Sequence, residues 1–215
     1  MRFTIGPIMQ GKAQPFRNEE HSAIAKTPVT GPVRIGPLGL EGDEQADRVH
    51  HGGVDKAIHH YPHDHYAYWQ STLGNHPLLD QPGAFGENIT TDGLTETALC
   101  LGDRLRLGSA LVEVSQGRQP CWKLDHRFAR KGIMAAIMTT ARSGWYYRVI
   151  EPGVVREGDT LELVARVHED WPVDRVFKLV LTGKAEHQGA DMRAVMAFPA
   201  LAATWRKRLA VLLDA

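Results

Sequence analysis

One cysteine lies in a setting that favours reactivity. The stretch SQGRQPCWKL, residues 115–124, ends a strand-like run and places Cys121 after Pro120, a residue that interrupts strand pairing. Basic residues surround it against a single acid, Asp125: Arg118, Lys123, Arg127, Arg130 and Lys131. Cations lower the pKa of a thiol toward the thiolate, which is both the nucleophile and the metal ligand. Since the same cations attract phosphate, the spacing favours a thiolate beside an anion site over a buried thiol.

The second cysteine has a different setting. Cys100 lies in the apolar run LCLGD, which is typical of a small core residue. The chain has no CxxC or Cys/His finger spacing, and a disulfide between the two cysteines is not expected in a reducing cytosol. Each thiol is therefore interpreted separately.

A second candidate segment is EGDEQADRVHHGGVDKA, residues 41–57. Gly52 and Gly53 let the backbone approach a ligand and point amide groups at an anion, while Lys56 adds a point charge. The alternative is an ordinary turn capped by Asp55. The spacing alone leaves these two interpretations even.

Histidines are concentrated next to this loop. Six of the 11 histidines fall between His50 and His65. Zinc sites need a definite pairing such as i, i+4 on one helix, and Pro62 interrupts the pair His59 and His63. We expect packed or surface histidines, one of them lining a ligand site, rather than a zinc site.

A third segment, GAFGENIT, is a glycine-flanked turn at residues 83–90. Its Asn88 offers a hydrogen-bond donor and an acceptor to a ligand. From the residues alone, an Asx turn that joins two strands is the favoured interpretation.

Strands must position these candidate residues. Up to about Val167 the chain consists of short apolar runs separated by glycine and proline, with the period of two that half-buried strands require. Gly-Asp turns lead into two of these runs, as in the strand pairs of a small barrel or sandwich. The expected strands are Ala23–Lys26, Val33–Ile35, Leu99–Leu107, Ala110–Val114 and Thr160–Val164.

Helices are expected inside this region and after it. Good helix formers cluster at Asp64–Leu73 and Ile133–Thr140. From Trp171 onward the apolar residues repeat every three to four positions, with Pro172 at a helix start and Gly183 at its end. The expected tail helices are Val173–Leu181, Asp191–Ala197 and Ala200–Leu213. The prediction is a mainly β domain over residues 1–167 and a three-helix domain over residues 168–215.

Composition limits the classes of function. The 215 residues are 43% hydrophobic, enough to bury a core, and 25 basic residues balance 25 acidic ones. No global field favours nucleic acid, and the cations at 206–208 are typical of a solvated helix face, so stable nucleic-acid binding is not expected. There is no apolar run of about 18 residues and no signal-peptide pattern. We expect a cytoplasmic protein with no membrane association.

Four segments together resemble the MOSC domain, named for the C-terminal domain of molybdenum cofactor sulfurase. They are GLEGDEQADRVHHGGVDKAIHHYP, GAFGENITTDGL, CLGDRLRLGSALVEVSQGRQPCWKL and GWYYRVIEPGVVREGD. The resemblance covers about residues 20 to 165, and the tail is similar to the three-helix domain of a bacterial subgroup linked to resistance against N-hydroxylated base analogues. The chain departs from the pattern at Gly117, where a proline is expected before the arginine, and in its extra histidines.

The resemblance implies an antiparallel β-barrel that holds molybdenum cofactor, a phosphorylated pterin whose dithiolene binds the metal. Cys121 matches the thiolate ligand of the metal, and Lys56 and Asn88 match polar residues around it. The resemblance therefore implies that Cys121, Lys56 and Asn88 are the catalytic residues. A soft thiolate suits molybdenum, and the basic run suits a phosphate. The residues expected to bind the cofactor are His51, Gly52, Gly53, Asp55, Lys56, Asn88, Arg118 and Gln119.

Two functions of different class follow from this resemblance. One is a reductase that removes the oxygen of an N-hydroxylated base or a related N-oxygenated compound in detoxification. The chain has no flavin, haem or iron–sulfur motif, so such a reductase requires an external electron-donor protein. The alternative is a carrier that delivers the cofactor, or sulfur held as a Cys121 persulfide. No pyridoxal-phosphate lysine motif is present to generate that sulfur. The oligomeric state is left open, with a homodimer among the alternatives.

Overall fold

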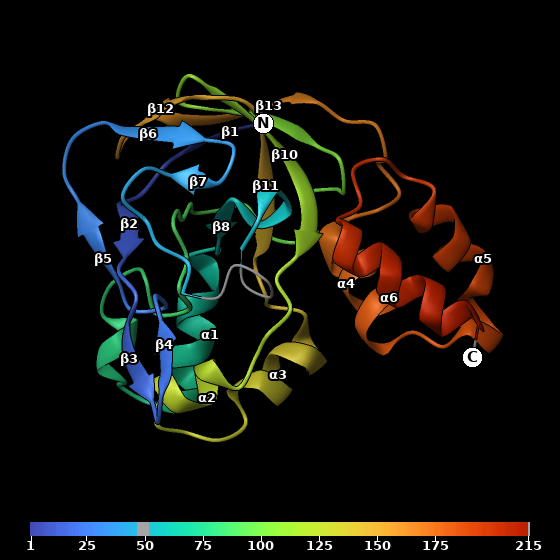
Figure 1. The fold of residues 1–215 in the computed structure, drawn as a ribbon, viewed down its shortest axis with the longest axis horizontal. Helices are drawn as coiled ribbons and strands as arrows, with labels where there is room; N and C mark the ends of the chain where they lie inside the picture. The colour runs from blue at the N-terminus through green and yellow to red at the C-terminus, as the bar shows by residue number, and fades with distance from the viewer. Residues whose placement is uncertain (47–51, 215) are drawn as a thin grey trace.

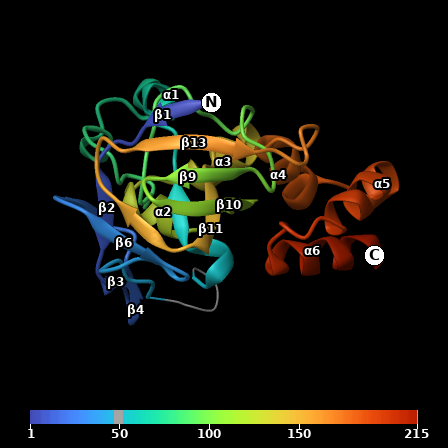
Figure 2. The same ribbon diagram turned by 90° about the horizontal axis from the view of Figure 1, so that it is seen from above.

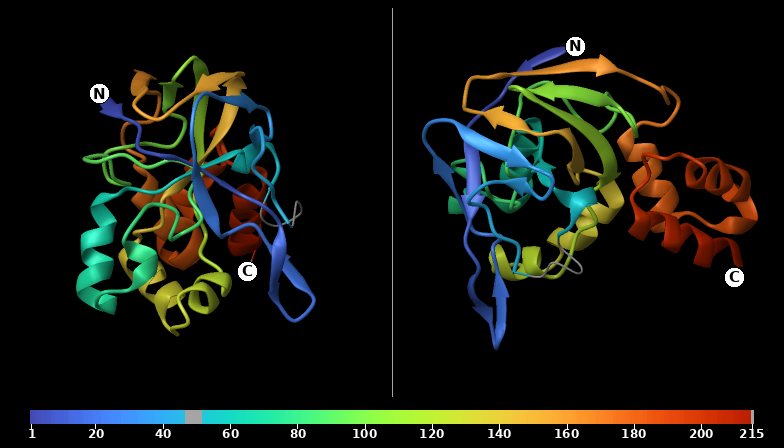
Figure 3. Two further views of the ribbon diagram at one scale, coloured as in Figure 1. Left: turned by 90° about the vertical axis from the view of Figure 1, so that its left-hand side faces the viewer. Right: turned by 45° about the horizontal axis from the view of Figure 1, so that its top comes forward.

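The computed structural model describes residues 1–46 and 52–214, and a six-stranded antiparallel sheet is its main element (Figure 1). The strand order is β1 (Arg2–Thr4), β13 (Thr160–Ala165), β9 (Arg104–Leu107), β10 (Ala110–Gly117), β11 (Trp145–Glu151) and β8 (Ile58–His60). Seen from above, these strands lie side by side (Figure 2), and two further views show that the sheet curls into a half-barrel (Figure 3). The predicted mainly β, antiparallel fold is confirmed.

Shorter strands extend the half-barrel. One three-stranded sheet contains β12 (Gly153–Val155), β6 (Val33–Gly36) and β7 (Gly39–Leu40). Two hairpin-like pairs join β2 (Ile8–Gly11) with β5 (Lys26–Val29), and β3 (Gln14–Arg17) with β4 (Glu20–Ser22). All of these pairs are antiparallel.

Sequence alternation produces the paired strands β9 and β13. Leu105 and Leu107 of β9 are buried while Arg104 is exposed, as the period of two predicts. Gly102 and Gly158 have φ values of +81° and +85°, a conformation that glycine adopts without strain. The two predicted Gly-Asp turns therefore lead into a strand pair.

The helices at residues 64–73, 133–140, 173–182 and 203–214 begin and end within three residues of the predicted bounds, and the helix at residues 123–127 was not predicted. The helices are α1 (Asp64–Leu73), α2 (Lys123–Arg127), α3 (Ile133–Thr140), α4 (Val173–Thr182), α5 (Ala185–Met196) and α6 (Ala203–Asp214), with short 3-10 turns η1 (Val54–Lys56) and η2 (Pro77–Leu79). Within the described residues, no helix combines the length and apolar character needed to span a membrane.

Some sequence predictions of local structure were wrong. The run Ala23–Lys26 is mostly outside a strand, since β5 begins at Lys26, and only the last four residues of Leu99–Leu107 form β9. Helix α5 begins at residue 185, well before the predicted Asp191. After Trp205, Lys207 and Arg208 are exposed as expected of a solvated helix face, and Arg206 and Arg208 also donate to the carbonyls of Phe198 and Val180.

Two hydrophobic clusters fill the molecule. One lies inside the half-barrel and contains Leu105, Val112, Trp145 and Leu161 among others. The other contains buried residues of α1–α3 and also of α4–α6, such as Phe177 and Trp205. The C-terminal helices, red in Figure 1, therefore share a core with helices that precede residue 167. A division into domains at 167/168 stays a prediction.

Gly117 is the position where the C-terminal helices approach the end of β10. A Cβ atom there would lie 3.0 Å from Trp205 and 3.2 Å from Phe177, and both rings are buried. The absence of the expected proline thus has a packing reason, because a side chain at this position would crowd the two rings and they would have to shift.

Gly117→Ala is expected to lower the free energy of unfolding by about 1–3 kcal/mol, as overpacking in a rigid core does. Thermal or urea unfolding measures the change. Gly36→Ala is the matched control, since nothing lies within 4 Å of the Cβ built there and its φ is not positive. Equal stability of the two variants would contradict the packing argument.

Candidate functional site

A single pocket brings together residues from distant parts of the chain. It has about 610 Å³ of empty volume, part of it open to solvent. Lys56, Asn88, Arg118 and Cys121 all line it, as the sequence predicts. Its other described lining residues include Ser22, Ala23, Ile24, Lys26, Asp43, Glu44, Gln45, Ala46, His59, Phe85, Gly86, Lys123 and Tyr146.

Cys121 lies half-buried in the loop between β10 and α2. The strand ends at Gly117, so the loop leaves the sheet just before Arg118 and reaches α2 two residues after the cysteine. Cys100 is 2% exposed, and burial raises the pKa of its thiol. The two thiols are not joined in a disulfide. Cys100 is thus confirmed as a core residue, and Cys121 is the thiol at the pocket.

Of the five cations around Cys121 in sequence, two reach the pocket. Arg118 and Lys123 line it, and both are largely buried. Arg127 and Arg130 instead donate to backbone carbonyls, of Ala84 and Leu73 respectively. The sequence prediction of a basic surrounding therefore rests on Arg118 and Lys123, while Arg127 binds the turn at Gly83 and Ala84 and Arg130 binds the end of α1.

Arg118 has unmet hydrogen-bonding capacity. Its Nη1 is buried, and no described residue accepts a hydrogen bond from it. Burial lowers the pKa of His59 well below its ordinary value, and the Arg118 charge lowers it further. Burial also raises the pKa of Tyr146, with Arg118 opposing the shift and Cys121 adding to it. His59 is therefore neutral, Tyr146 keeps its proton, and a bound anion would supply the partner that Arg118 lacks.

A buried carboxylate fixes another wall of the pocket. Asp43 accepts hydrogen bonds from the backbone amide of Gly11 at 2.7 Å and from Lys26 Nζ at 2.5 Å. Burial lowers the pKa of Lys26, and the Asp43 charge opposes that shift. Sequence reasoning missed both residues as parts of the site. Asp43 lies within the glycine-rich segment, so the motif could have indicated it as a site residue. No motif contains Lys26.

Asn88 lines the pocket, but its side-chain amide forms hydrogen bonds with other residues of the protein. Its Nδ2 donates to Asp43 Oδ2 at 2.8 Å and to the Met9 carbonyl at 3.1 Å, while its Oδ1 accepts from the His59 amide at 3.0 Å. These contacts cross between segments and do not form an Asx turn. Glu87 fixes the turn itself by accepting from the amides of Gly83 and Phe85.

The glycine-rich loop contributes less of the pocket surface than predicted. Gly52, Gly53, Asp55 and Gln119 are not among its described lining residues. Gly53 has a φ of +95° and directly precedes η1, which carries Lys56. Asp55 points its carboxylate at Arg148 and the Ala203 amide instead. His51 lies outside the described residues. The cofactor contacts expected of these five residues stay predictions.

The described histidines of the cluster have separate environments. His59 lines the candidate pocket, and a contact between one of these histidines and a ligand stays a prediction. His60 is buried, with Nδ1 3.1 Å from the Tyr147 hydroxyl and Nε2 3.0 Å from Thr91 Oγ1. His63 pairs with Asp92 at the surface. Among the described residues, no group of three or more His, Cys, Asp or Glu side chains could hold a metal ion.

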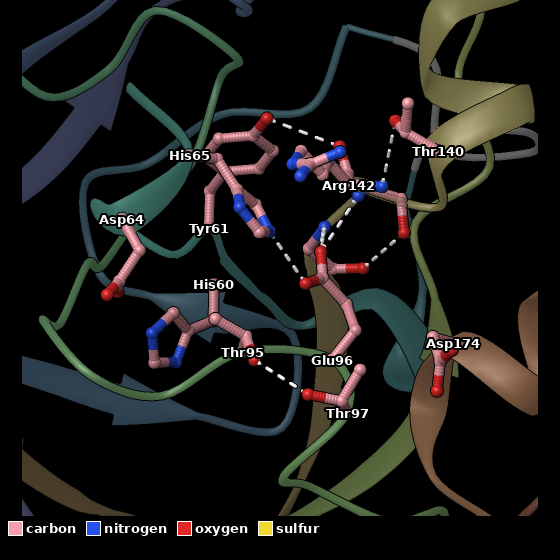
Figure 4. A network of polar contacts seen from close by, with 12 residues as sticks. His60, Tyr61, Asp64, His65, Thr95, Glu96, Thr97, Thr140, Arg142 and Asp174 are labelled. Atoms are coloured by element: carbon pink, nitrogen blue, oxygen red, sulfur yellow. Dashed lines mark hydrogen bonds and ion pairs between the residues drawn. The ribbon is translucent and has the colours of Figure 1, made fainter. Parts of the chain in front are cut away.

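Glu96 anchors the turn that leads into β11 (Figure 4). Its buried carboxylate accepts from the backbone amides of Ser143 and Gly144 at 2.8 and 2.7 Å, and lies 2.7 Å from His65 Nε2. The Gly144 carbonyl in turn accepts from the Arg118 amide. This network therefore positions both Arg118 and the start of the strand that carries Tyr146.

The hairpin of β3 and β4 packs along the segment that follows Cys121. Phe16 contacts His126 edge to face with ring centroids 4.7 Å apart, and Lys123 donates to the His21 carbonyl at 3.3 Å. In Figure 1 this blue hairpin lies beside α2. The hairpin thus supports one side of the pocket.

The described pocket carries more cations than carboxylates. Lys26, Lys56, Arg118 and Lys123 face Asp43 and Glu44. The chain as a whole has no net charge, so the excess is local. A soft sulfur ligand beside this local positive charge suits a metal that binds thiolate and belongs to a larger anionic ligand.

The curled antiparallel sheet and the cysteine on the loop after β10 are the features to compare with known protein families. The chain belongs to the MOSC family, since the model described as MOSC domain matches residues 47–162. The resemblance stated from the four sequence segments is confirmed.

The chain is also similar to individual members of known sequence and structure. The chain is 45% identical to Protein YiiM of Escherichia coli (strain K12) over 169 residues, 79% of this chain and 75% of that protein. A protein named Reductase from Gibberella moniliformis (strain M3125 / FGSC 7600) is 38% identical over 160 residues, 74% of this chain and 28% of that protein. The crystal structure of YiiM from Geobacillus stearothermophilus matches with a TM-score of 0.81 and 35% identity, covering 97% of this chain and 99% of that one.

Acid should destabilise the protein through its buried histidines. Burial lowers the pKa of His60 to about 3, whereas an unfolded histidine titrates near about 6.5. Below about pH 6.5 the unfolded chain binds a proton at this histidine that the folded chain does not. The contribution of His60 to the free energy of unfolding is therefore fully present above about pH 6.5, and it falls by about 1.4 kcal/mol per pH unit toward pH 3.

Urea unfolding at pH 7 and pH 5 tests this expectation. His60→Gln should lose less stability between the two pH values than the unsubstituted protein, because one titrating group is gone. The exposed His187 gives the control variant His187→Gln, which should keep the full loss. An unchanged loss in His60→Gln would remove His60 from the explanation.

Proposed function

We propose that the protein is a molybdenum-cofactor-dependent reductase of N-hydroxylated bases or related N-oxygenated compounds. The observation that carries the proposal is the meeting of Lys56, Asn88 and the loop residues Arg118 and Cys121, from three separate segments, at one locally cationic pocket. Membership of the MOSC family and a relative named Reductase support it.

The pocket residues fit molybdenum cofactor. Cys121 offers the soft sulfur ligand that molybdenum accepts, and the unmet Arg118 Nη1 offers a donor to a phosphate. Lys56 and Lys123 add positive charge around the same group. Asn88 contributes by holding Asp43 and the His59 backbone in place. When bound, the cofactor supplies the two-electron redox centre.

Reduction of an N-hydroxylated base breaks the N–O bond and consumes two electrons and two protons, giving the amine and water. Tyr146 retains its hydroxyl proton, because burial raises its pKa, and can donate a hydrogen bond to a polar substrate in the pocket. The electrons come from an external electron-donor protein. We place this reaction in the cytoplasm, with a small-molecule substrate.

Cys121→Ser tests the thiolate. The variant is expected to fold with nearly unchanged stability, because a half-buried loop thiol contributes little packing, yet to form no amine from an N-hydroxylated base. Amine formation is measured with a chemical reductant and normalised to bound molybdenum. Cys100→Ala is the matched control and should remain active. Full activity of Cys121→Ser would exclude the thiolate from the reaction.

The same assay separates the reductase from a carrier. A carrier of cofactor, or of sulfur as a Cys121 persulfide, would form no amine even when loaded with molybdenum. It would instead restore activity to an acceptor apo-enzyme. That outcome with the unsubstituted protein would replace the reductase proposal.

Lys56→Ala tests the cationic pocket. Loss of a charge-assisted contact worth about 1.5–3 kcal/mol should lower cofactor retention by about tenfold or more, with turnover per bound molybdenum little changed. Retention is measured as pterin per protein after gel filtration. Lys178→Ala, which removes an exposed lysine paired with Asp174, is the control. Normal retention by Lys56→Ala would contradict its assigned role.

A further inference from the structure

The C-terminal helices are bonded to the residue that precedes Lys56. Asp55 Oδ2 accepts a hydrogen bond from the amide of Ala203, the first residue of α6, at 2.9 Å. Its Oδ1 accepts from Arg148 Nη2 at 2.7 Å. A carboxylate at a helix N-terminus is favourable because it meets the positive end of the helix dipole and an unsatisfied amide. Both oxygens of Asp55 are thus engaged by groups outside the pocket.

Arg148 extends this contact across the sheet. Its Nη2 also donates to the Ala200 carbonyl at 2.9 Å, and its Nη1 donates to Glu113 Oε1 at 3.2 Å and to the Pro199 carbonyl at 3.3 Å. Both Arg148 and Asp55 are mostly buried, with side chains 21% and 23% exposed. One guanidinium therefore joins β10, η1 and the segment before α6.

The same helices hold the end of β10. The Ala202 amide donates to the Ser115 carbonyl at 3.0 Å, and Ser115 Oγ donates to the Asp55 carbonyl at 2.6 Å. Thr204 Oγ1 donates to Gln116 Oε1 at 3.3 Å. The chain then runs directly into the loop that carries Arg118 and Cys121. The two segments that present Lys56 and Cys121 therefore share one support.

Lys56 needs such a support. It lies in a 3-10 turn of three residues that follows Gly53, and so short an element does not hold its own backbone firmly. Ordering a lysine side chain for binding costs up to about 2 kcal/mol of entropy, and a fixed backbone reduces the cost paid on binding.

We propose that Asp55, Arg148 and the N-terminus of α6 form a clamp that positions Lys56, so that the C-terminal helices set the pocket's affinity for its anion. In this proposal Asp55 and Arg148 are positioning residues, which act through Lys56 rather than through a contact of their own with the ligand. The inference rests on the proposed function in one respect, which is that molybdenum cofactor is the anion that the pocket binds.

A double-mutant cycle on cofactor retention tests the clamp. Asp55→Ala should lower the pterin retained per protein by roughly tenfold, and Asp55→Asn, which can still cap α6, should lose less. In a Lys56→Ala background, Asp55→Ala should cause no additional loss, because its effect passes through Lys56. Multiplying losses in the double variant would overturn the proposal.

Arg166→Ala controls for stability. Arg166 pairs with buried Asp103 just after β13, and neither residue lines the pocket, so the variant should lower Tm without lowering retention. If Asp55→Ala lowers Tm to the same extent as Arg166→Ala and retains as much pterin, Asp55 has only a structural role and the clamp is wrong.

Hydrogen exchange separates failure of the clamp from failure of the proposed function. The amide of Lys56 donates to the Gly53 carbonyl, so exchange of residues 53–57 reports on η1 without any cofactor. Asp55→Ala should accelerate this exchange and Arg166→Ala should not. Unchanged exchange in Asp55→Ala would overturn the clamp. Accelerated exchange in a protein that never holds pterin would keep the clamp and reject the cofactor.

Discussion

The pocket depends on one buried carboxylate. Asp43 receives hydrogen bonds from Gly11, Lys26 and Asn88, and these donors come from three segments far apart in the sequence. A buried charge is tolerated only when it is paired and hydrogen-bonded, and leaving one partner uncompensated typically costs about 3–5 kcal/mol. The segments that build this wall are therefore obliged to meet, because the alternative is an unpaired buried ion. Asn88 extends the constraint to β8 by accepting from the His59 amide.

This constraint determines which pocket charges remain available. The Asp43 charge pairs with Lys26 inside the wall and offsets that lysine, so Lys56, Arg118 and Lys123 are the other cations that line the pocket. His59 adds no charge, because burial and Arg118 both lower its pKa. Local positive potential can thus arise in a chain with 25 basic and 25 acidic residues. Net charge determines solubility and long-range steering, whereas the potential inside a pocket depends on which of its charged groups are already paired.

Sequence patterns predicted the elements that carry strong local signals. The bounds of α1 and α3 agree with the helix formers of the sequence, and β9 and β13 follow from alternation after Gly-Asp turns. Helix α2 and the short strands β1 to β4 were missed, because three to five residues carry too little periodicity to be distinguished from loop. Among site residues, Cys121 and Lys56 had chemical settings visible in sequence. Lys26 and Tyr146 became part of the pocket only through pairing between distant segments, which spacing along the chain does not encode.

The C-terminal helices explain the departure from the family pattern at Gly117 and the contacts that Asp55 makes. A proline was expected at Gly117, and a ligand contact was expected at Asp55. Trp205 and Phe177 fill the space that a side chain at Gly117 would need, and the Ala203 amide takes one oxygen of Asp55. Both positions lie directly before residues that line the pocket, Arg118 and Lys56. In this chain the helices thus pack against the ends of the elements that present the site, and the glycine at position 117 suits this packing.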